Sequence, residues 1–429
     1  MRTIHILTVL AALAGPLGAP LAAGDAKFHT VYRFDTGAGG APPNGLVESG
    51  GVFYGTTQGG GTYYDGTVFS LKPPTNRAGN WTETVLHNFD SQAGDGGQPY
   101  APPVVGPGGV LYGTTGYGGA YCNEQTPLGC GTVYQMVPPS TPGGAWTESV
   151  LFSFNYGAPG RGPQSELIPC SDPSVCTAGA IYGTTAAGGI YAYGTVFELQ
   201  PPASPGGAWA ETVLYSFTGG NDGNGPYGLT MSANGTLYGV TAAGGTDGGG
   251  GAGTVFELTP PAMPGGAWTE TVLHSFLGGR DGSAPYEAPL IAADGTLYGN
   301  TYGACEKLCS IPYGVGTVFA LRPPATPGGT WAKRILHDFG GASPDSPLAF
   351  RGGAVYGTFS LPPGNGGCIF KLQHGSGGKW EETVLHTFPD NVNPFGNFVM
   401  SKKGTIVGTA INSVPKNDHP TDSAYSLRP

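Results

Sequence analysis

The stretch Trp268-Thr269-Glu270-Thr271-Val272-Leu273-His274-Ser275-Phe276 decides the fold, because close variants of it recur along the whole chain. Its pattern is Trp-x-Glu-x-Val-Leu-x-x-Phe, and each of the six tryptophans opens one copy. The other five copies span residues 81–89, 146–154, 209–217, 331–339 and 380–388. A version without Trp, residues 28–34, precedes them. A regular recurrence of this kind predicts seven structural repeats.

Three further motifs recur in step with the Trp motif. They are a proline-led apolar segment such as 99–105 or 226–231, a Tyr-Gly-Thr-Thr segment such as 182–185, and a Gly-Thr-Val-Phe segment such as 194–197. All are short, rich in β-branched and aromatic residues, and bounded by Gly or Pro, which is typical of strands. Units of 49 to 65 residues with four strands match propeller blades. The sequence therefore predicts an all-β fold, a seven-bladed β-propeller with four-stranded blades.

The order of the motifs divides one unit between the two ends of the chain. The first motif is a lone fourth strand at residues 28–34, and the last is a third strand at 424–427. We expect the N-terminal strand to pair in the last blade and so to close the ring, which leaves no unpaired edge there. Residues 25–429 are expected to form this single propeller domain.

The first 24 residues have the pattern of a secretory signal peptide. Arg2 precedes an apolar run at 6–14, and small residues follow at 19–24. We therefore expect a secreted or periplasmic mature protein, and a monomer. The apolar run is too short and too interrupted for a bilayer, so we expect no membrane span in the mature chain. A net charge of −10 without a basic run argues against nucleic acid as a partner.

Six of the seven cysteines lie in pairs that are close in sequence. We expect disulfides, which form in an oxidising compartment, between Cys122 and Cys130, Cys170 and Cys176, and Cys305 and Cys309. Cys368 is left over. No second Cys/His pair completes a zinc site, so we expect neither a metal nor another cofactor. Calcium at the Asp-Gly turns is a weaker alternative, because no Asp-x-Asp-x-Asp ladder accompanies them.

The side chains that repeat most regularly are interpreted as structural. One position of the Trp motif always holds a ring, which indicates packing rather than proton transfer: Tyr32, His87, Phe152, Tyr215, His274, His337 and His386. A second position holds a charge, which indicates a solvated outer strand: Glu83, Glu148, Glu211, Glu270, Lys333 and Glu382. The tryptophans are expected to fill the space between neighbouring sheets. No catalytic residue is predicted.

The phrases LYGVT at 237–241, GTVFEL at 253–258 and ETVLHSF at 270–276 resemble the GloVer tandem repeat of secreted bacterial proteins. The resemblance covers nearly all of the mature chain. It implies export and a propeller-like repeat array, and it supplies no catalytic residues. Many family members carry a C-terminal sorting anchor, whereas this chain ends directly after its last strand motif, which favours a soluble secreted or periplasmic protein.

A binding function is expected on the loops in which the copies differ. The candidate ligand-binding residues are Asp95, Tyr100, Asp222, Tyr227, Asp281 and Tyr286. Tyrosines stack on sugar rings and neighbouring acids bind hydroxyls, so we interpret the chain as a binding or surface module for a polysaccharide or cell-surface glycan. Turn chemistry alone also accounts for each Asp-Gly pair. Two alternatives stay open: a carbohydrate-active hydrolase or lyase on a propeller scaffold, and a purely structural or adhesive surface protein.

Overall fold

The computed structural model describes residues 27–34, 42–76, 79–119, 129–204, 206–246, 251–263, 265–303, 316–326, 328–361, 365–412 and 422–429. Within these ranges the regular elements are strands, together with two short 3₁₀ turns, η1 (Pro107–Gly109) and η2 (Gly279–Asp281). The all-β prediction is therefore confirmed. None of the helical segments in the described part of the chain has the length and apolar character of a membrane-spanning helix.

The repeat unit folds as an antiparallel sheet of four strands. The most complete example comprises β14 (Asn224–Met231), β15 (Leu237–Ala243), β16 (Thr254–Thr259) and β17 (Thr269–Ser275). Each strand pairs with its neighbour in sequence. The proline-led, Tyr-Gly, Gly-Thr-Val-Phe and Trp motifs give the first, second, third and fourth strands respectively.

Four other sheets repeat this arrangement. The first two are β6 (Val104–Val105), β7 (Leu111–Thr115), β8 (Thr132–Val137) and β9 (Thr147–Ser153), then β10 (Ile168–Pro169), β11 (Ile181–Thr185), β12 (Thr195–Gln200) and β13 (Ala210–Ser216). The third is β18 (Leu290–Ile291), β19 (Leu297–Thr301), β20 (Thr317–Arg322) and β21 (Ala332–Asp338). In the fourth, β22 (Ser343–Pro344) and β23 (Ala349–Arg351) both pair with β24 (Ala354–Ser360), and β25 (Cys368–His374) and β26 (Trp380–Thr387) follow.

The remaining strands form one eight-stranded sheet that contains both ends of the described chain. One half is β2 (Pro43–Ser49), β3 (Val52–Thr57), β4 (Thr67–Lys72) and β5 (Thr82–Asn88). The other is β27 (Val392–Met400), β28 (Ile406–Asn412), β29 (Ser423–Arg428) and β1 (Lys27–Arg33). A parallel bridge between Gly45 and Asn397 joins the halves, and β1 pairs antiparallel with β29.

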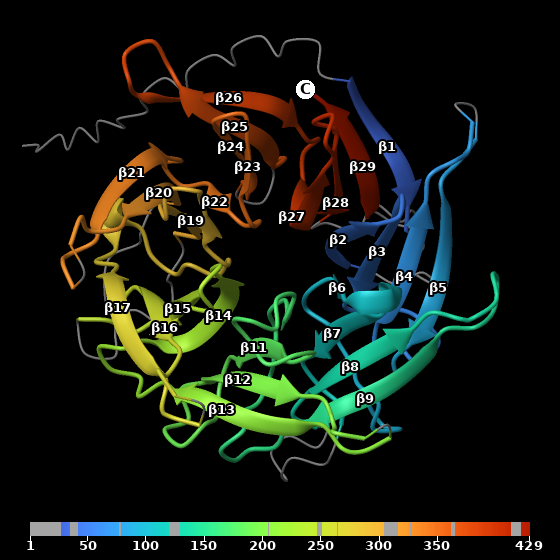
Figure 1. Cartoon of the computed structure of the whole chain (residues 1–429). Coiled ribbons are helices and arrows are strands. Elements are labelled where there is room, and N and C mark those ends of the chain that lie inside the picture. Colours follow the sequence, from blue (N-terminus) through green and yellow to red (C-terminus); the bar gives the residue numbers. More distant parts are fainter. Residues whose placement is uncertain are drawn as a thin grey trace, which may run out of the picture.

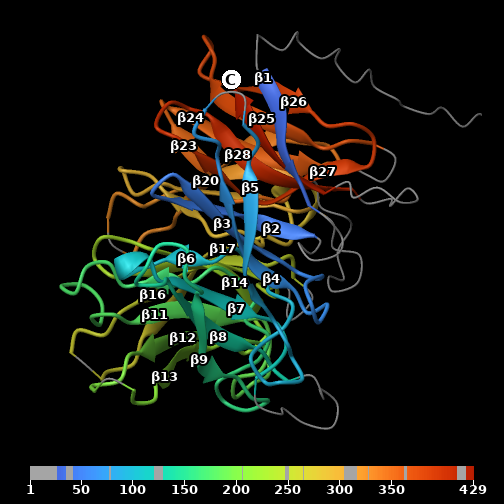
Figure 2. The same cartoon turned by 90° about the vertical axis from the view of Figure 1, so that its right-hand side faces the viewer.

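The sheets lie around a common centre, with the fourth strands β5, β9, β13, β17, β21 and β26 at the rim (Figure 1). The start of β1 lies beside the C-terminus in both views (Figure 2), as the pairing of Lys27 with Arg428 requires. The labelled first strands β2, β6, β14, β22 and β27 lie nearest the centre in Figure 1, and residues of the proline-led segments line one cavity there. This arrangement positions the site described below.

The core between neighbouring sheets is built from one recurrent aromatic contact. The Phe that ends each Trp motif packs edge-on, or tilted in the case of Phe339, against the aromatic residue of the third strand in the next four-stranded unit, with ring centroids 5.0 to 5.3 Å apart. Phe276 and Phe319 are one such pair. The ring of Phe319 lies so close to Gly299 that a Cβ there would come within 2.5 Å of it. This close approach explains the Gly of the Tyr-Gly motif.

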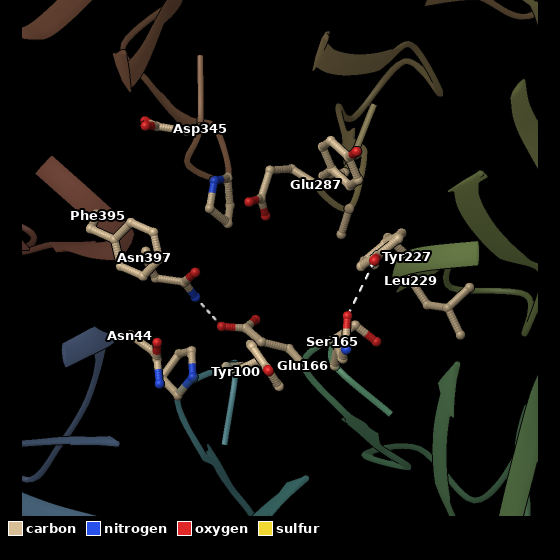
Figure 3. A pocket seen from close by; sticks show the side chains of 18 residues that line it. Asn44, Tyr100, Ser165, Glu166, Tyr227, Leu229, Glu287, Asp345, Phe395 and Asn397 are labelled. Atoms are coloured by element: carbon tan, nitrogen blue, oxygen red, sulfur yellow. Dashed lines mark hydrogen bonds between the residues drawn. The ribbon is translucent and has the colours of Figure 1, made fainter. Parts of the chain in front are cut away.

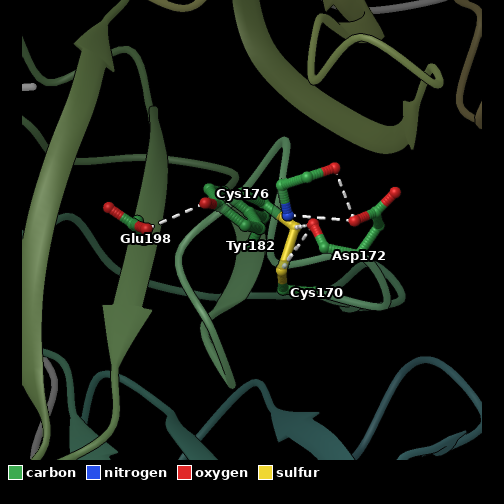
Figure 4. The surroundings of a disulfide bond; sticks show 6 residues. Cys170, Asp172, Cys176, Tyr182 and Glu198 are labelled. Carbon is green, nitrogen blue, oxygen red and sulfur yellow. Dashed lines mark hydrogen bonds between the residues drawn. A yellow bond between two sulfur atoms is a disulfide. The ribbon is translucent and has the colours of Figure 1, made fainter. Parts of the chain in front are cut away.

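Trp146, Trp331 and Trp380 contact a tyrosine of the preceding sheet, as expected from their position in the motif. Trp331 lies 6.2 Å from the ring of Tyr238, and Trp146 lies 5.8 Å from that of Tyr54. The disulfide between Cys170 and Cys176 is present, with an S–S distance of 1.97 Å, in the segment between β10 and β11 (Figure 4). Cys130 is also disulfide-bonded, and Cys368 is a buried free thiol. The predictions for Cys122, Cys305, Cys309 and the signal peptide lie outside the described residues.

Candidate functional site

A cavity of about 280 Å³ lies where the proline-led segments of all the sheets converge (Figure 3). Each segment contributes the one to three residues that follow its proline. Representative lining residues are Asn44 from β2, Gln164 from the segment before β10, Tyr227 from β14 and Asn397 from β27. A cavity of this size is near the small end of known ligand pockets. It can hold a small ligand or one unit of a longer chain.

Three of the predicted site residues, Tyr100, Tyr227 and Tyr286, line this cavity. The rings of Tyr227 and Tyr286 meet edge to face with centroids 5.0 Å apart, and the Tyr227 hydroxyl donates a hydrogen bond to Gln164 Oε1 at 3.2 Å. Burial raises the pKa of Tyr227 to about 12, so its phenol stays neutral at physiological pH. The tyrosines therefore provide rigid, partly polar walls.

Three carboxyl groups that were not predicted line the same cavity: Glu166, Glu287 and Asp345. Glu166 accepts a hydrogen bond from the amide of Asn397, and Asp345 accepts hydrogen bonds from Ser360 and Thr358. Glu287 makes no hydrogen bond to the other described residues, and its side chain points into the cavity (Figure 3). These side chains are enclosed by protein yet still contact the solvent of the cavity.

Enclosure changes how these acids titrate. Burial raises the pKa of Glu166 and of Asp345 to about 7. Burial, together with the nearby charges of Glu166 and Asp345, raises the pKa of Glu287 to about 8. No Lys, Arg or His is found among the described residues that line the cavity. The cavity can therefore exchange protons near neutral pH, and it becomes strongly negative once its acids ionise.

The three predicted aspartates lie elsewhere, in the turns that follow the fourth strands. Asp95 lies 2.8 Å from His87 Nε2, Asp222 accepts hydrogen bonds from Thr218 and Tyr215, and Asp281 accepts one from the backbone N–H of Leu277. None of the three lines the cavity. The structure thus brings the predicted tyrosines together and places the predicted aspartates at the rim, where they shape turns.

The charged position of the Trp motif differs from the solvated outer strand that the sequence suggested. Glu148, Glu211 and Glu270 each have one carboxyl oxygen without solvent contact, and burial raises the pKa of each to about 7. These residues face the ring position of the preceding sheet, as in the contact of His337 Nε2 with Glu382 at 3.4 Å. The prediction was wrong because a residue on the outermost strand is still covered by its neighbouring sheet.

One of these contacts brings three possible metal ligands together. A ring nitrogen of His87 and one carboxylate oxygen from each of Asp95 and Glu148 lie within 4.8 Å of one another. His87 and Asp95 already contact each other directly, and the equivalent residues Tyr215, Asp222 and Glu270 form a similar group without a histidine. The recurrence of this group at equivalent positions identifies it as a contact between sheets.

The sequence carried a signal for the acids that was not used. Glu166, Glu287 and Asp345 follow their prolines by one to three residues, as do the predicted tyrosines. Comparing the three residues that follow the proline in each copy would have shown that their chemistry differs while the rest of the motif is retained. The apolar character of the motif hid the acids, because they lie in a segment expected to be buried.

Comparisons with known proteins agree with the repeat architecture. The family model described as the Gloeobacter/Verrucomicrobia repeat matches residues 20–174 and 171–419. A search of curated protein sequences found no match. Among solved structures, a polysaccharide lyase of family PL25, an ulvan lyase, is 13% identical over 88% of this chain and 90% of its own, with a TM-score of 0.54.

A second similar structure is the polysaccharide lyase Uly1. It is 12% identical, covers 89% of this chain and 88% of its own, and has a TM-score of 0.50. At such low identity these likenesses indicate a shared propeller-like fold and nothing about activity. The match of the repeat model across nearly the whole sequence, together with the recurring four-stranded sheets, shows that the chain belongs to the Gloeobacter/Verrucomicrobia repeat family.

Proposed function

We propose that the protein is an exported, seven-bladed β-propeller that binds a glycan in its central cavity. The eight-stranded sheet supports the number of seven blades. A single bridge joins its two halves, and each half is itself an antiparallel sheet that matches a four-stranded unit. The pairing of β1 with β29 supports closure of the ring. Residues 25–429 form the domain, residues 1–24 are the signal peptide, and the mature protein is a secreted or periplasmic monomer.

The observation that carries the proposal is the convergence of Tyr100, Tyr227 and Tyr286 with carboxyl and amide groups in one cavity. Sugars present both apolar ring faces and many hydroxyls, so their sites combine aromatic walls with a few polar groups. The lining supplies both kinds of group from separate sheets, which holds them rigidly in place. Asp95, Asp222 and Asp281 are not part of this proposed site.

The test is a glycan array with the mature protein, followed by titration calorimetry of the retained glycan. We expect Tyr227→Ala and Tyr286→Ala each to weaken binding by about tenfold or more, the loss of roughly 1.4 kcal/mol of contact. Tyr63→Ala is the matched control, because Tyr63 is 54% exposed and lies outside the cavity. The proposal fails if the wild-type protein retains no glycan, which would favour the structural or adhesive role.

A carbohydrate-active enzyme is the second candidate, and the raised pKa values of Glu166 and Glu287 favour it. Two carboxyl groups with different proton affinities in one cavity are the usual requirement of acid–base glycan cleavage. Incubation with the retained glycan would reveal new reducing ends for a hydrolase or new double bonds for a lyase. Turnover by the wild-type protein that Glu287→Gln abolishes even at saturating glycan would establish the enzyme; an unchanged glycan would exclude it.

A further inference from the structure

The polar groups that the cavity offers to a ligand are mainly acceptors. Glu166 and Glu287 direct their carboxyl groups inward (Figure 3), and the described lining includes no Lys, Arg or His. The side-chain nitrogen of Asn44 is already engaged, because it donates to Thr56 Oγ1 at 3.2 Å and to the carbonyl of Pro99 at 2.6 Å. The carbonyl oxygen of Asn44 is then the part of that amide left for a ligand. Acceptors of this kind require a ligand rich in donors.

The aromatic walls favour the same ligand chemistry. Tyr100, Tyr227 and Tyr286 line the cavity beside the carboxyl groups, and the face of an aromatic ring attracts a cation through its quadrupole. Burial weakens the competition from water, so both the ring faces and the carboxylates bind an ammonium group more strongly than they would at the surface. An acidic sugar would instead meet carboxylates without a compensating cation.

A bare metal ion fits this geometry less well than an organic cation does. Among the described residues, the group of three whose ligand atoms lie within 4.8 Å of one another is His87, Asp95 and Glu148, outside the cavity. The carboxyl groups of Glu166, Glu287 and Asp345 are therefore spread around the cavity rather than gathered at one point. Such spacing suits a ligand whose ammonium and hydroxyl donors are themselves spread over several atoms.

We propose that the cavity selects a ligand that carries a protonated amine, in the first place an amino-sugar unit of a glycan, over neutral and acidic sugars. This inference rests on the glycan-binding role proposed above and names its ligand class. Glu287 is the main partner of the ammonium group, because it points inward and is not occupied by another described side chain. It gives up its proton when the cation binds, since a neighbouring positive charge favours the ionised carboxylate. Glu166, which is already held by Asn397, contributes charge and accepts hydrogen bonds.

The test compares three trisaccharides by titration calorimetry near neutral pH: a glucosamine trimer, an N-acetylglucosamine trimer and a galacturonate trimer. Spermidine is the non-sugar amine. We expect the glucosamine trimer to bind at least about tenfold more tightly than its N-acetylated counterpart, and added salt to reduce that preference. Glu287→Gln should remove most of the preference, and Glu166→Gln part of it. Glu381→Gln is the control, because Glu381 is exposed and lies outside the cavity.

The outcomes separate the two proposals. Equal or tighter binding of the N-acetylated or the galacturonate trimer would overturn the selection for an amine and leave glycan binding intact. Binding of spermidine without any sugar would overturn glycan binding and retain the selection for an amine. The absence of binding by all four probes would overturn the selection for an amine, and it would overturn glycan binding as well if the array also retains no glycan. Thermal unfolding of Glu287→Gln, together with Glu287→Asp as a charge-retaining variant, distinguishes loss of charge from loss of the folded protein.

Discussion

At the scale of single residues, Lys333 shows how one substitution within the repeat rearranges the charges between two sheets. It occupies the position that Glu148 and Glu270 hold in other copies, and its Nζ lies 2.7 Å from Asp281 Oδ1 and 4.2 Å from the ring centre of Phe276. Burial lowers the pKa of Lys333 to about 8. Burial would raise the pKa of Asp281, but hydrogen bonds from His274 and Lys333 outweigh it and hold that pKa well below its usual range.

We expect Asp281→Asn to lower the free energy of unfolding by about 3 kcal/mol, because it leaves a buried ammonium group without its counter-charge. Asp222→Asn is the matched control in the neighbouring copy. This change weakens the hydrogen bonds to Tyr215 and Thr218 but leaves no cation without a counter-charge. The expected loss of unfolding free energy is therefore about 1 kcal/mol. Urea unfolding of both variants measures the difference. Equal losses would show that the ion pair contributes nothing beyond the shape of the turn.

At the scale of elements, the aromatic contact between adjacent sheets is the main link from one repeat to the next. Phe276 is 1% exposed and packs against the fully buried Phe319 of the following sheet. Every junction between sheets has an equivalent pair. The length and register of the fourth strand therefore have to place the Phe that ends the Trp motif against the third strand of the next unit. The outer strands are thus defined by packing between sheets as well as within them.

Phe276→Ala is expected to cost about 4 kcal/mol of unfolding free energy, because a large buried side chain is removed and its neighbours cannot close the cavity. Leu277→Ala, one residue further along, is the control: Leu277 is 59% exposed, and a change below about 0.5 kcal/mol is expected. Thermal and denaturant unfolding of both variants measures these two losses of unfolding free energy. A small loss at Phe276 would mean that the sheets are held together by other contacts.

The elements also show where sequence patterns succeed and where they stop. The Tyr-Gly, Gly-Thr-Val-Phe and Trp motifs predict the second to fourth strands, because side-chain alternation and Gly or Pro boundaries are local signals. The proline-led segment predicted over residues 99–105 contains only the short strand Val104–Val105. Proline lacks a backbone N–H for the ladder, and the residues that follow it line the cavity instead of extending the sheet.

At the scale of the whole molecule, buried acids dominate the response to pH. The pKa is raised to about 7 for Glu148, Glu211, Glu270, Glu166 and Asp345, and to about 8 for Glu287. In each case burial is the largest cause. A carboxyl group whose folded pKa exceeds its unfolded value holds its proton more tightly in the folded state. Its stabilising effect is therefore present at low pH and is lost as pH rises through the folded pKa.

We accordingly expect the melting temperature to be highest near about pH 5 and to fall toward about pH 8. Glu166→Gln combined with Glu287→Gln should flatten this decline, since two of the responsible groups no longer titrate. Calorimetric melting across this range provides the measurement. A melting temperature that rises with pH would contradict the assignment of these acids as uncompensated buried groups.

The same scale explains why the site was predicted only in part. The period of the repeat indicates which residues share a position, and it led to Tyr100, Tyr227 and Tyr286 because they recur. Glu166, Glu287 and Asn397 each occur in one copy, and Glu166 and Asn397 are 231 residues apart in sequence. Their meeting depends on how the sheets are arranged around the centre, and a local pattern carries no information on that arrangement.

The pairing of β1 with β29 has a consequence for how the protein is made. Every other sheet pairs strands that are close in sequence and are therefore synthesised soon after one another. By contrast, β1 cannot pair until β29 has been synthesised, because Lys27 is the partner of Arg428. A chain that ends early, or is clipped near its C-terminus, therefore leaves β1 without a partner and displays an open strand to proteases. Loss of β29 would therefore leave β1 without a partner and one edge of β28 unpaired, because β29 pairs with each of them.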